Sequence, residues 1–418
     1  MIKMQIVADI GGIPGVDCKG FCKYCYFKKV KYMEPLGCIS CSPGKIGCSR
    51  CGEELRESKN NFKLPFIVMS EIQSTLMLGN YRDKDLKVNI SGGGDLSCYP
   101  HLNELTSTLN QFGLNSHIGY TSGKGFENGE IAKTLVNNGV DEVTYTVFST
   151  DHNLRREWVK DQNPDESLKA LKIFSESIEV HGASVIIPGV NDGDVLLKTC
   201  SDLESWGAKA LILMRFANTT NQGLILKNAP ILKDIETHSV EEFKDLVKEI
   251  NSQFNLRVTG TPVFDPETNA PFAIAKDGNE IYLQFIQEVT GEATIISSKI
   301  AGPYIAKIFE KIGADDVNIV CTEKEIACLI TKEDLEDIDL SEVKDAVIIP
   351  GRSFIHNLDA EKIFSKDGKE RVVGRGPDKL SVDGEMSGTL TEEQVIEREL
   401  EEFRELVQAV NFFGMKKR

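Results

Sequence analysis

The chain has 418 residues, of which 41% are hydrophobic and 27% are charged, as in ordinary globular proteins. This length predicts two or three domains, and the net charge of −16 argues against DNA or RNA as the main partner. No apolar run reaches the length of a membrane helix and the first residues lack a signal-peptide pattern, so we expect a cytoplasmic protein without a membrane partner.

The first half of the chain alternates between strand-like apolar runs and helix-like amphipathic stretches. The expected strands cover residues 4–10, 88–91, 117–121, 142–148, 184–187 and 210–214. Six β-α repeats without a dinucleotide-binding fingerprint predict a parallel, partly closed α/β barrel. In such barrels the chemistry takes place at the carboxyl ends of the strands.

Three cysteines follow the first expected strand. Cys18, Cys22 and Cys25 have the spacing C-x3-C-x2-C. Iron–sulfur cubanes are normally held by four thiolates, so three thiolates leave one iron open for another ligand. Catalytic metal sites leave a position open in the same way. A zinc loop is the weaker interpretation, because the uneven spacing differs from the C-x2-C pairs of zinc ribbons.

A second group of cysteines comes directly after the first. Cys38 with Cys41, and Cys48 with Cys51, form two C-x2-C pairs that predict one tetrahedral metal with four sulfur ligands. Zinc, a single iron or an auxiliary cluster would each fit this spacing. Eleven cysteines without a secretory signal favour metal binding over disulfides.

Polar and glycine residues gather where the later expected strands end. These residues are Ser91, Gly92, Gly93, Gly94, Asp95, Tyr120, Gly189 and Asn191. Glycines let backbone carbonyls approach a bound group closely. Because the strands are expected to be parallel, we expect these residues to meet at one rim of the barrel.

The second half of the chain predicts a different domain. A helix over 240–253, with Ser239 and Glu242 as its capping box, is followed by a turn-rich linker at 259–266. The order β-α-β-β-α-β over 293–350 predicts a split βαβ unit in an α+β domain, and a final helix is expected over 392–413. We therefore expect a barrel over 1–230, which includes the cysteine loop 31–60, a connection over 231–265 and a C-terminal domain over 266–418.

The cysteine spacing, the four-cysteine loop and the Gly-Gly-Gly-Asp run together resemble the radical S-adenosylmethionine (SAM) enzymes and, among them, the methanogenesis marker protein ten family. The resemblance implies a radical SAM partial (β/α)6 barrel that holds a [4Fe–4S] cluster on Cys18, Cys22 and Cys25. It implies that residues 91–95 bind the methionine end of SAM, and that Gly189 and Asn191 lie against its adenosine part. It also implies cobalamin in the C-terminal domain, although no Asp-x-His-x-x-Gly segment offers a histidine to cobalt.

The resemblance further implies C-methylation of an arginine δ-carbon in the α subunit of methyl-coenzyme M reductase. No side-chain base can deprotonate such an sp3 carbon, so a radical must remove its hydrogen atom, and methylcobalamin would donate the methyl group. One alternative is a cobalamin-independent radical SAM peptide-modifying enzyme with an auxiliary cluster. Another is a zinc-dependent scaffold protein that is not an enzyme.

Three further residues are candidates for the site. The phenol of Tyr120 could approach the open iron, although a tyrosine that packs in the barrel mouth is the simpler interpretation. An arginine substrate requires carboxylates, since bidentate pairs hold a guanidinium best. Asp161 and Glu385 lie in loop-like stretches of separate domains and are the candidates, although most of the 64 acidic residues are expected to be solvated.

Overall fold

The computed structural model of the chain describes residues 4–29, 61–78, 86–225, 228–262, 264–269, 272–377, 380 and 390–415. The chain divides into two compact units. The described residues of Met1–Lys29, Glu53–Phe216 and Ile231–Thr259 form the N-terminal unit. Those of Ala217–Pro230 and Gly260–Arg418 belong to the C-terminal unit.

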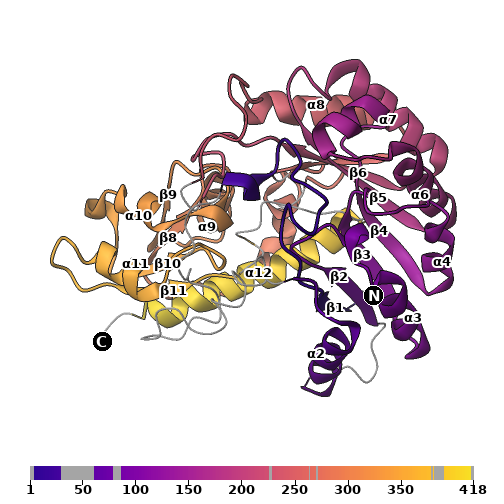
Figure 1. Cartoon of the computed structure of the whole chain (residues 1–418). Coiled ribbons are helices and arrows are strands. Elements are labelled where there is room, and N and C mark those ends of the chain that lie inside the picture. Colours follow the sequence, from indigo (N-terminus) through magenta and orange to yellow (C-terminus); the bar gives the residue numbers. More distant parts are fainter. Residues whose placement is uncertain are drawn as a thin grey trace. The chain divides into compact units, whose positions relative to one another are not determined.

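The N-terminal unit is a seven-stranded sheet with helices along it (Figure 1). In spatial order its strands are β1 (Met4–Asp9), β2 (Leu86–Ser91), β3 (Asn115–Thr121), β4 (Val140–Thr146), β5 (Glu179–Ile186), β6 (Ala210–Arg215) and β7 (Arg257–Thr261). Its helices include α2 (Pro65–Leu78), α3 (Leu102–Gln111), α4 (Ile131–Asn137), α5 (His152–Leu154), α6 (Pro164–Ser177), α7 (Gly193–Trp206) and α8 (Val240–Gln253).

Strands β1 to β6 pair in parallel, which confirms the predicted α/β barrel architecture. The sheet differs from the prediction at its end, because β7 adds a seventh strand beside β6. The expected connection at 231–265 therefore contributes α8 and β7 to the barrel unit. The predicted capping box of α8 is present, with the Glu242 N–H donating to the Ser239 hydroxyl.

Alternating side chains give the strands of this sheet an apolar face and a polar face. Val143 and Tyr145 of β4 are fully buried, and the Tyr145 hydroxyl donates to the Ser167 carbonyl of α6 at 2.6 Å. On the opposite face, the register places His117 of β3 beside Glu142 of β4. Helices thus cover the apolar face, as parallel sheets require, and the polar face and the strand ends remain for a site.

The C-terminal unit contains a four-stranded parallel sheet. Its spatial order is β11 (Val372–Arg375), β10 (Ala346–Ile349), β8 (Ala293–Ser297) and β9 (Val317–Cys321). The helices of this unit are α9 (Gly302–Lys311), α10 (Lys332–Glu336), α11 (Asn357–Phe364) and α12 (Glu392–Phe413). The predicted split βαβ unit is wrong, because residues 326–330 contain the short 3-10 helix Ala327–Leu329 where a strand was expected.

Helices cover both faces of this second sheet. Ile295 of β8 packs in one apolar cluster with residues of α9 and α12, whereas its neighbour Ile296 packs in another with residues of α10 and α11. Helix α12 buries Phe403 and Val407 in the first cluster, and it begins with the predicted capping box of Thr391. The unit is therefore doubly wound rather than α+β.

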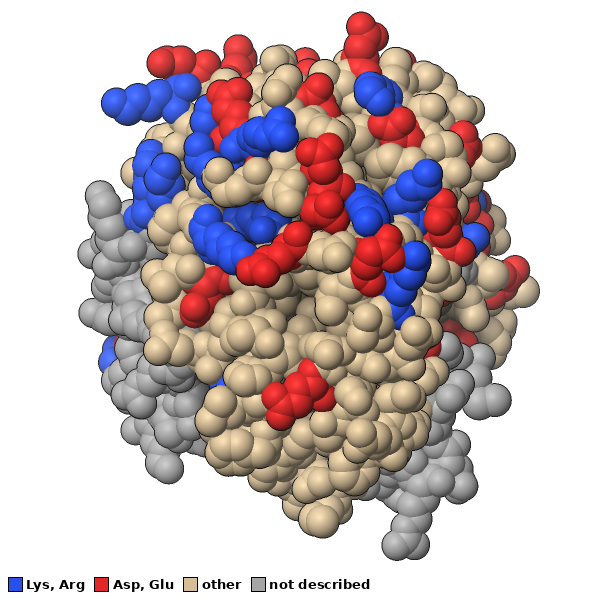
Figure 2. Space-filling view, turned by 45° about the vertical axis from the view of Figure 1, so that its right-hand side comes forward, with Lys and Arg blue, Asp and Glu red and all other residues tan. Residues whose placement is uncertain are grey.

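Charged side chains of both signs lie side by side over the upper part of the face in Figure 2, while the lower part of that face is largely uncharged. This mixture keeps a protein soluble without a strong field of one sign. None of the helices in the described part of the chain is long and apolar enough to cross a membrane.

Candidate active site

The cysteine loop follows β1, as predicted, and its shape is fixed by short-range hydrogen bonds. The Ile13 N–H donates to the Asp17 carboxylate at 2.7 Å, and the Gly20 N–H donates to the Gly15 carbonyl at 2.9 Å. Cys18, Cys22 and Cys25 are free and partly exposed. The loop therefore presents three thiols at the carboxyl end of the first strand.

The three thiols match the ligand number of a cubane that leaves one iron open. No group of three or more His, Cys, Asp or Glu residues in the described part of the chain converges on a single metal position. In a cubane each thiolate binds a different iron, so convergence on one point is not required. The thiols nevertheless lie close enough for the charges of Cys18 and Cys22 to raise the pKa of Cys25.

Burial is the main cause of raised pKa values in the loop. It raises the pKa of Cys25 to about 11 and also raises the pKa values of Cys18 and Cys22, while the positive charge of Lys124 lowers all three. Metal ligands must be deprotonated, so cluster binding has to displace these protons.

The glycine run after β2 packs against the start of the cysteine loop. The Gly93 N–H donates to the Gly11 carbonyl at 3.0 Å, and a Cβ atom on Gly92 would lie only 2.4 Å from the same oxygen. Ser91 ends β2 and pairs with Asp9 of β1. The close approach that requires glycine at position 92 is thus between two segments of the chain itself, and it sets the position of the cysteine loop.

Asp95 joins the ends of two strands. Its carboxylate accepts from the N–H and hydroxyl of Ser97, from the Thr121 hydroxyl at 3.0 Å, and from the N–H and hydroxyl of Ser122. Because both oxygens are occupied by the protein, the prediction that Asp95 binds a cofactor directly is not supported. Its carboxylate instead fixes the glycine run after β2 to the rim after β3.

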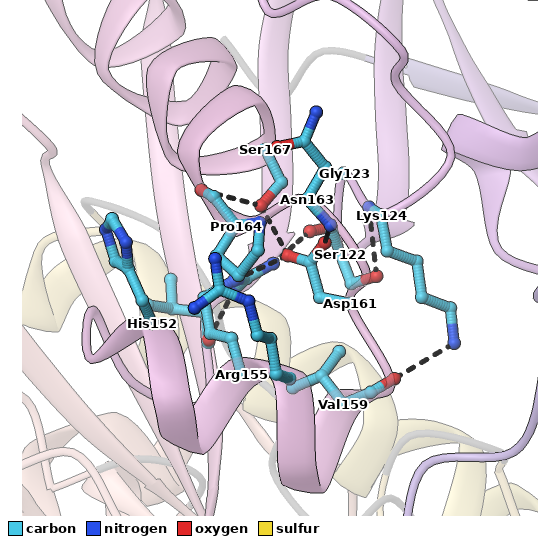
Figure 3. Close-up of polar contacts among 12 residues, drawn as sticks. Ser122, Gly123, Lys124, His152, Arg155, Val159, Asp161, Asn163, Pro164 and Ser167 are labelled. Carbon is cyan, nitrogen blue, oxygen red and sulfur yellow. Dashed lines mark hydrogen bonds and ion pairs between the residues drawn. The ribbon is translucent and has the colours of Figure 1, made fainter.

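A buried arginine continues this network, as Figure 3 shows. Arg155 has no exposed surface, and its guanidinium donates to the Val147 carbonyl at 2.6 Å, the Ser122 carbonyl at 2.6 Å and the Asp161 carboxylate at 2.9 Å. Arg155 begins a five-residue π-helix that ends at Val159. Short π-helical turns are frequent at functional sites. The arginine thus ties this turn to the ends of β3 and β4.

Asp161 is therefore a correction to the sequence-based assignment. Its side chain has no exposed surface, and its carboxylate also accepts from the Ser167 hydroxyl and the Asn163 N–H. Asp161 does bind a guanidinium, but it is that of Arg155. The carboxylate cannot receive a substrate arginine in this arrangement.

Asn191 and Gly189 support the loop after β5. Asn191 is 1% exposed, and its amide group donates to the Phe148 and Val185 carbonyls and accepts from the Ile187 N–H. The polar atoms of Asn191 hold this turn in shape, and its place against the adenosine part of SAM stays a prediction. Gly189 lies at the surface of this turn, where a Cβ atom would meet nothing.

Tyr120 lies near the end of β3 and is 41% exposed, so its placement at the rim agrees with the prediction. Its approach to iron stays a prediction. The four cysteines of the expected second metal, Cys38, Cys41, Cys48 and Cys51, lie outside the described residues, as does Glu385.

Sequence reasoning missed an aromatic stack beside the cysteine loop. The Tyr24 ring stacks on Phe148 at 4.9 Å between centroids, and Phe148 stacks on Trp158 at 5.8 Å. The ammonium of Lys23 lies 4.9 Å from the Trp158 ring and pairs with Glu157. The only sequence signal was the presence of aromatic residues inside and after the cysteine motif, which is too common to indicate a contact.

Residues 13–197 match the radical SAM superfamily. No curated protein matches the chain. Among solved structures, SuiB of Streptococcus suis is similar, with 12% identity over 62% of this chain and 49% of SuiB and a TM-score of 0.42. The chain thus spans about half the length of SuiB.

Two radical SAM methyltransferases are also similar. That of Sphaerobacter thermophilus has 13% identity over 62% of this chain and 67% of its own, with a TM-score of 0.37. TsrM of Kitasatospora setae has 10% identity over 50% of this chain and 35% of its own, with a TM-score of 0.32. The family match and the parallel sheet together identify residues 13–197 as a radical SAM domain, which implies a [4Fe–4S] cluster and SAM.

Proposed function

We propose that this protein is a cobalamin-dependent radical SAM methyltransferase that C-methylates the δ-carbon of an arginine in a protein. The proposed substrate is the α subunit of methyl-coenzyme M reductase, as the resemblance in the two cysteine groups and the Gly-Gly-Gly-Asp run suggests. The observation that carries the proposal is the cysteine loop at the carboxyl end of β1, packed against the glycine run of a radical SAM domain.

The chain's own residues have positioning roles in this proposal. When bound, the cluster and SAM supply a radical that removes a hydrogen atom from an unactivated carbon. Cys18, Cys22 and Cys25 would hold the cluster, while Asp95 and Arg155 keep the surrounding rim in place. Their hydrogen bonds are made within the protein, so they can hold the shape of the rim without a bound ligand.

The doubly wound sheet of the C-terminal unit supports a cofactor there. The chain adds β9 on one side of β8 and then β10 and β11 on the other, so the strand order reverses between β8 and β10. In doubly wound sheets, ligands bind at such a point, outside the carboxyl ends of the strands. A small cavity of about 20 Å³ lies there, lined by residues that include Ser297, Pro350, Gly376 and Pro377.

A groove on the C-terminal unit supports a basic peptide as partner. Its volume is about 360 Å³. Its lining residues are Tyr282, Phe285, Glu393, Ile396, Glu397, Leu400, Glu401 and Arg404. Glu393, Glu397 and Glu401 are exposed, lie four residues apart on α12 and form no ion pair with a described residue. The Arg404 side chain instead donates to the Phe285 carbonyl. An acidic wall beside the exposed Phe285 ring and the partly buried Tyr282 ring suits a segment that carries arginine or lysine next to an apolar residue.

The test uses anaerobically purified protein, SAM with a labelled methyl group and a short peptide with one internal arginine. We expect a single labelled methyl group on carbon, and no turnover when lysine replaces the arginine, because an ammonium lacks the planar fork of a guanidinium. Cys22→Ala should abolish SAM cleavage. Methylation on nitrogen, or equal turnover of the lysine peptide, would contradict the proposal.

The cobalamin content of the purified protein distinguishes a cobalamin-dependent methyltransferase from a cobalamin-independent radical SAM enzyme. Peptide modification by protein that carries no cobalamin would favour a cobalamin-independent radical SAM enzyme. Iron and sulfide analysis of the same sample distinguishes both from a zinc scaffold protein.

A further inference from the structure

We propose that Lys124 is a positioning residue for the iron–sulfur cluster, which locks the cysteine loop and places one uncompensated positive charge beside it. This inference rests on the radical SAM domain and not on methyl transfer. Lys124 comes directly after β3 and is 7% exposed. Its ammonium donates to the Gly20 carbonyl at 2.9 Å and to the Val159 carbonyl at 3.2 Å, and it lies 3.9 Å from the Cys22 sulfur.

One ammonium thus joins three segments that are far apart in the sequence. Gly20 and Cys22 belong to the cysteine loop, Val159 ends the π-helix, and Lys124 itself belongs to the rim after β3 (Figure 3 shows its contact with Val159). The backbone before it is constrained, because Gly123 has φ +73° and a Cβ atom there would lie 1.7 Å from the Tyr145 hydroxyl. The direction in which Lys124 leaves the rim is therefore fixed.

Among the residues that the structure describes, no contact neutralises the charge of Lys124. Lys124 forms no ion pair with any carboxylate of the described residues, and the neighbouring Asp95 carboxylate is occupied by Ser97, Thr121 and Ser122. A cluster with three thiolates gains negative charge when it is reduced, and a buried positive charge favours that form more strongly than an exposed one. Net charge and hydrogen bonds near the sulfurs are among the factors that set cluster potentials.

Lys23 offers a matched control in the same loop. It is adjacent to Cys22 and carries the same charge, but its ammonium pairs with Glu157 and lies over the Trp158 ring. Its side chain is also one-third exposed, so its charge is compensated and partly screened. A lysine-to-methionine change at either position keeps an unbranched side chain that is one atom shorter and removes its charge.

The experiment compares Lys124→Met, Lys124→Arg and Lys23→Met in the full chain. For each we would measure iron and sulfide per chain, the rate of iron loss to a chelator, and the cluster's midpoint potential by a spectroscopic redox titration. We expect Lys124→Met to lower the potential and to lose iron several-fold faster, or to assemble less cluster. Lys124→Arg should lie closer to the wild type, and Lys23→Met should match it.

The pair of substitutions at position 124 keeps the test decisive. If Lys124→Met matches the wild type in iron content, iron loss and potential, the inference is overturned. It is also overturned if Lys124→Arg is as impaired as Lys124→Met, because the positive charge then has no role of its own.

Discussion

A chain of buried polar contacts links the residues that surround the cysteine loop. It runs from Asp95 through Ser122 to Arg155 and on to Asp161, and neither charge of the final pair has access to water. A buried ion pair is costly to form, and removing one partner leaves the other charge uncompensated. The network is therefore expected to specify the shape of the rim.

Asp161→Ala tests this role against the substrate-binding role expected from the sequence. The change leaves the buried Arg155 guanidinium without its carboxylate partner, so we expect the free energy of unfolding to fall by about 3–5 kcal/mol. A substrate-binding carboxylate would instead alter peptide KM and leave stability unchanged. Denaturant unfolding measures the difference, and Glu157→Gln is the control, because its exposed pair with Lys23 contributes about 0–1 kcal/mol.

The sequence was sufficient to predict the three cluster cysteines, but it did not predict this buried polar network. Cys18, Cys22 and Cys25 are recognisable because their spacing is itself the signal. Asp161 was noticed as an acidic residue in a loop, and acidic residues in loops are usually solvated. Its partner Arg155 is separated from it by a π-helical turn, which no residue pattern indicates. Burial of this pair therefore became visible only in the structure.

At the scale of elements, periodicity predicted the barrel better than the C-terminal unit. The strands of the barrel lie between amphipathic helices, so their order follows from the alternation. In the C-terminal unit the apolar run 326–330 was expected to be a strand, but Ile330 is buried beneath a 3-10 turn. Short apolar runs do not distinguish these states. The four-residue β11 was missed because it lies in a glycine-rich stretch.

Helix α12 contains a carboxyl group that should make stability depend on pH. Glu399 is 5% exposed, and its carboxyl oxygens accept from the Ala273 and Ile274 N–H groups at 3.0 and 2.8 Å. Burial raises the pKa of Glu399 to about 8, although these two hydrogen bonds lower it. The folded state therefore keeps a proton that the unfolded chain has already released.

Stability should accordingly decrease as pH rises from about 4.5 to about 8, because the unfolded state binds fewer protons over this range. Glu399→Gln removes the titrating group, so the difference in Tm between pH 5 and pH 8 should become smaller than in the wild type. Thermal unfolding at both pH values measures this effect. The exposed Glu397→Gln on the same helix should leave the difference unchanged, and an equal effect of both changes would refute the assignment.

At the scale of the whole molecule, the excess of 64 acidic over 48 basic residues says little by itself about partners. Figure 2 shows both signs mixed on one face. The groove on α12 differs, because its three glutamates are aligned along one helix and lie beside apolar side chains. Helix α8 carries acidic residues at the same spacing, Glu241, Asp245 and Glu249, which are also exposed and do not belong to the lining of this groove, although Asp245 pairs with Lys248.

These two helices allow a controlled test of the proposed docking of a basic peptide. Neutralising Glu393, Glu397 and Glu401 to glutamine should raise KM about 3- to 150-fold for a long peptide whose flank carries arginine and lysine, since exposed pairs contribute roughly 0.2–1 kcal/mol each. The kcat, and the KM of a short peptide without that flank, should not change. Salt should shrink the difference, because these charges are solvated. The same neutralisation on α8 should leave every value as in the wild type, and an equal rise in KM there would show that net charge, rather than the groove, attracts the peptide.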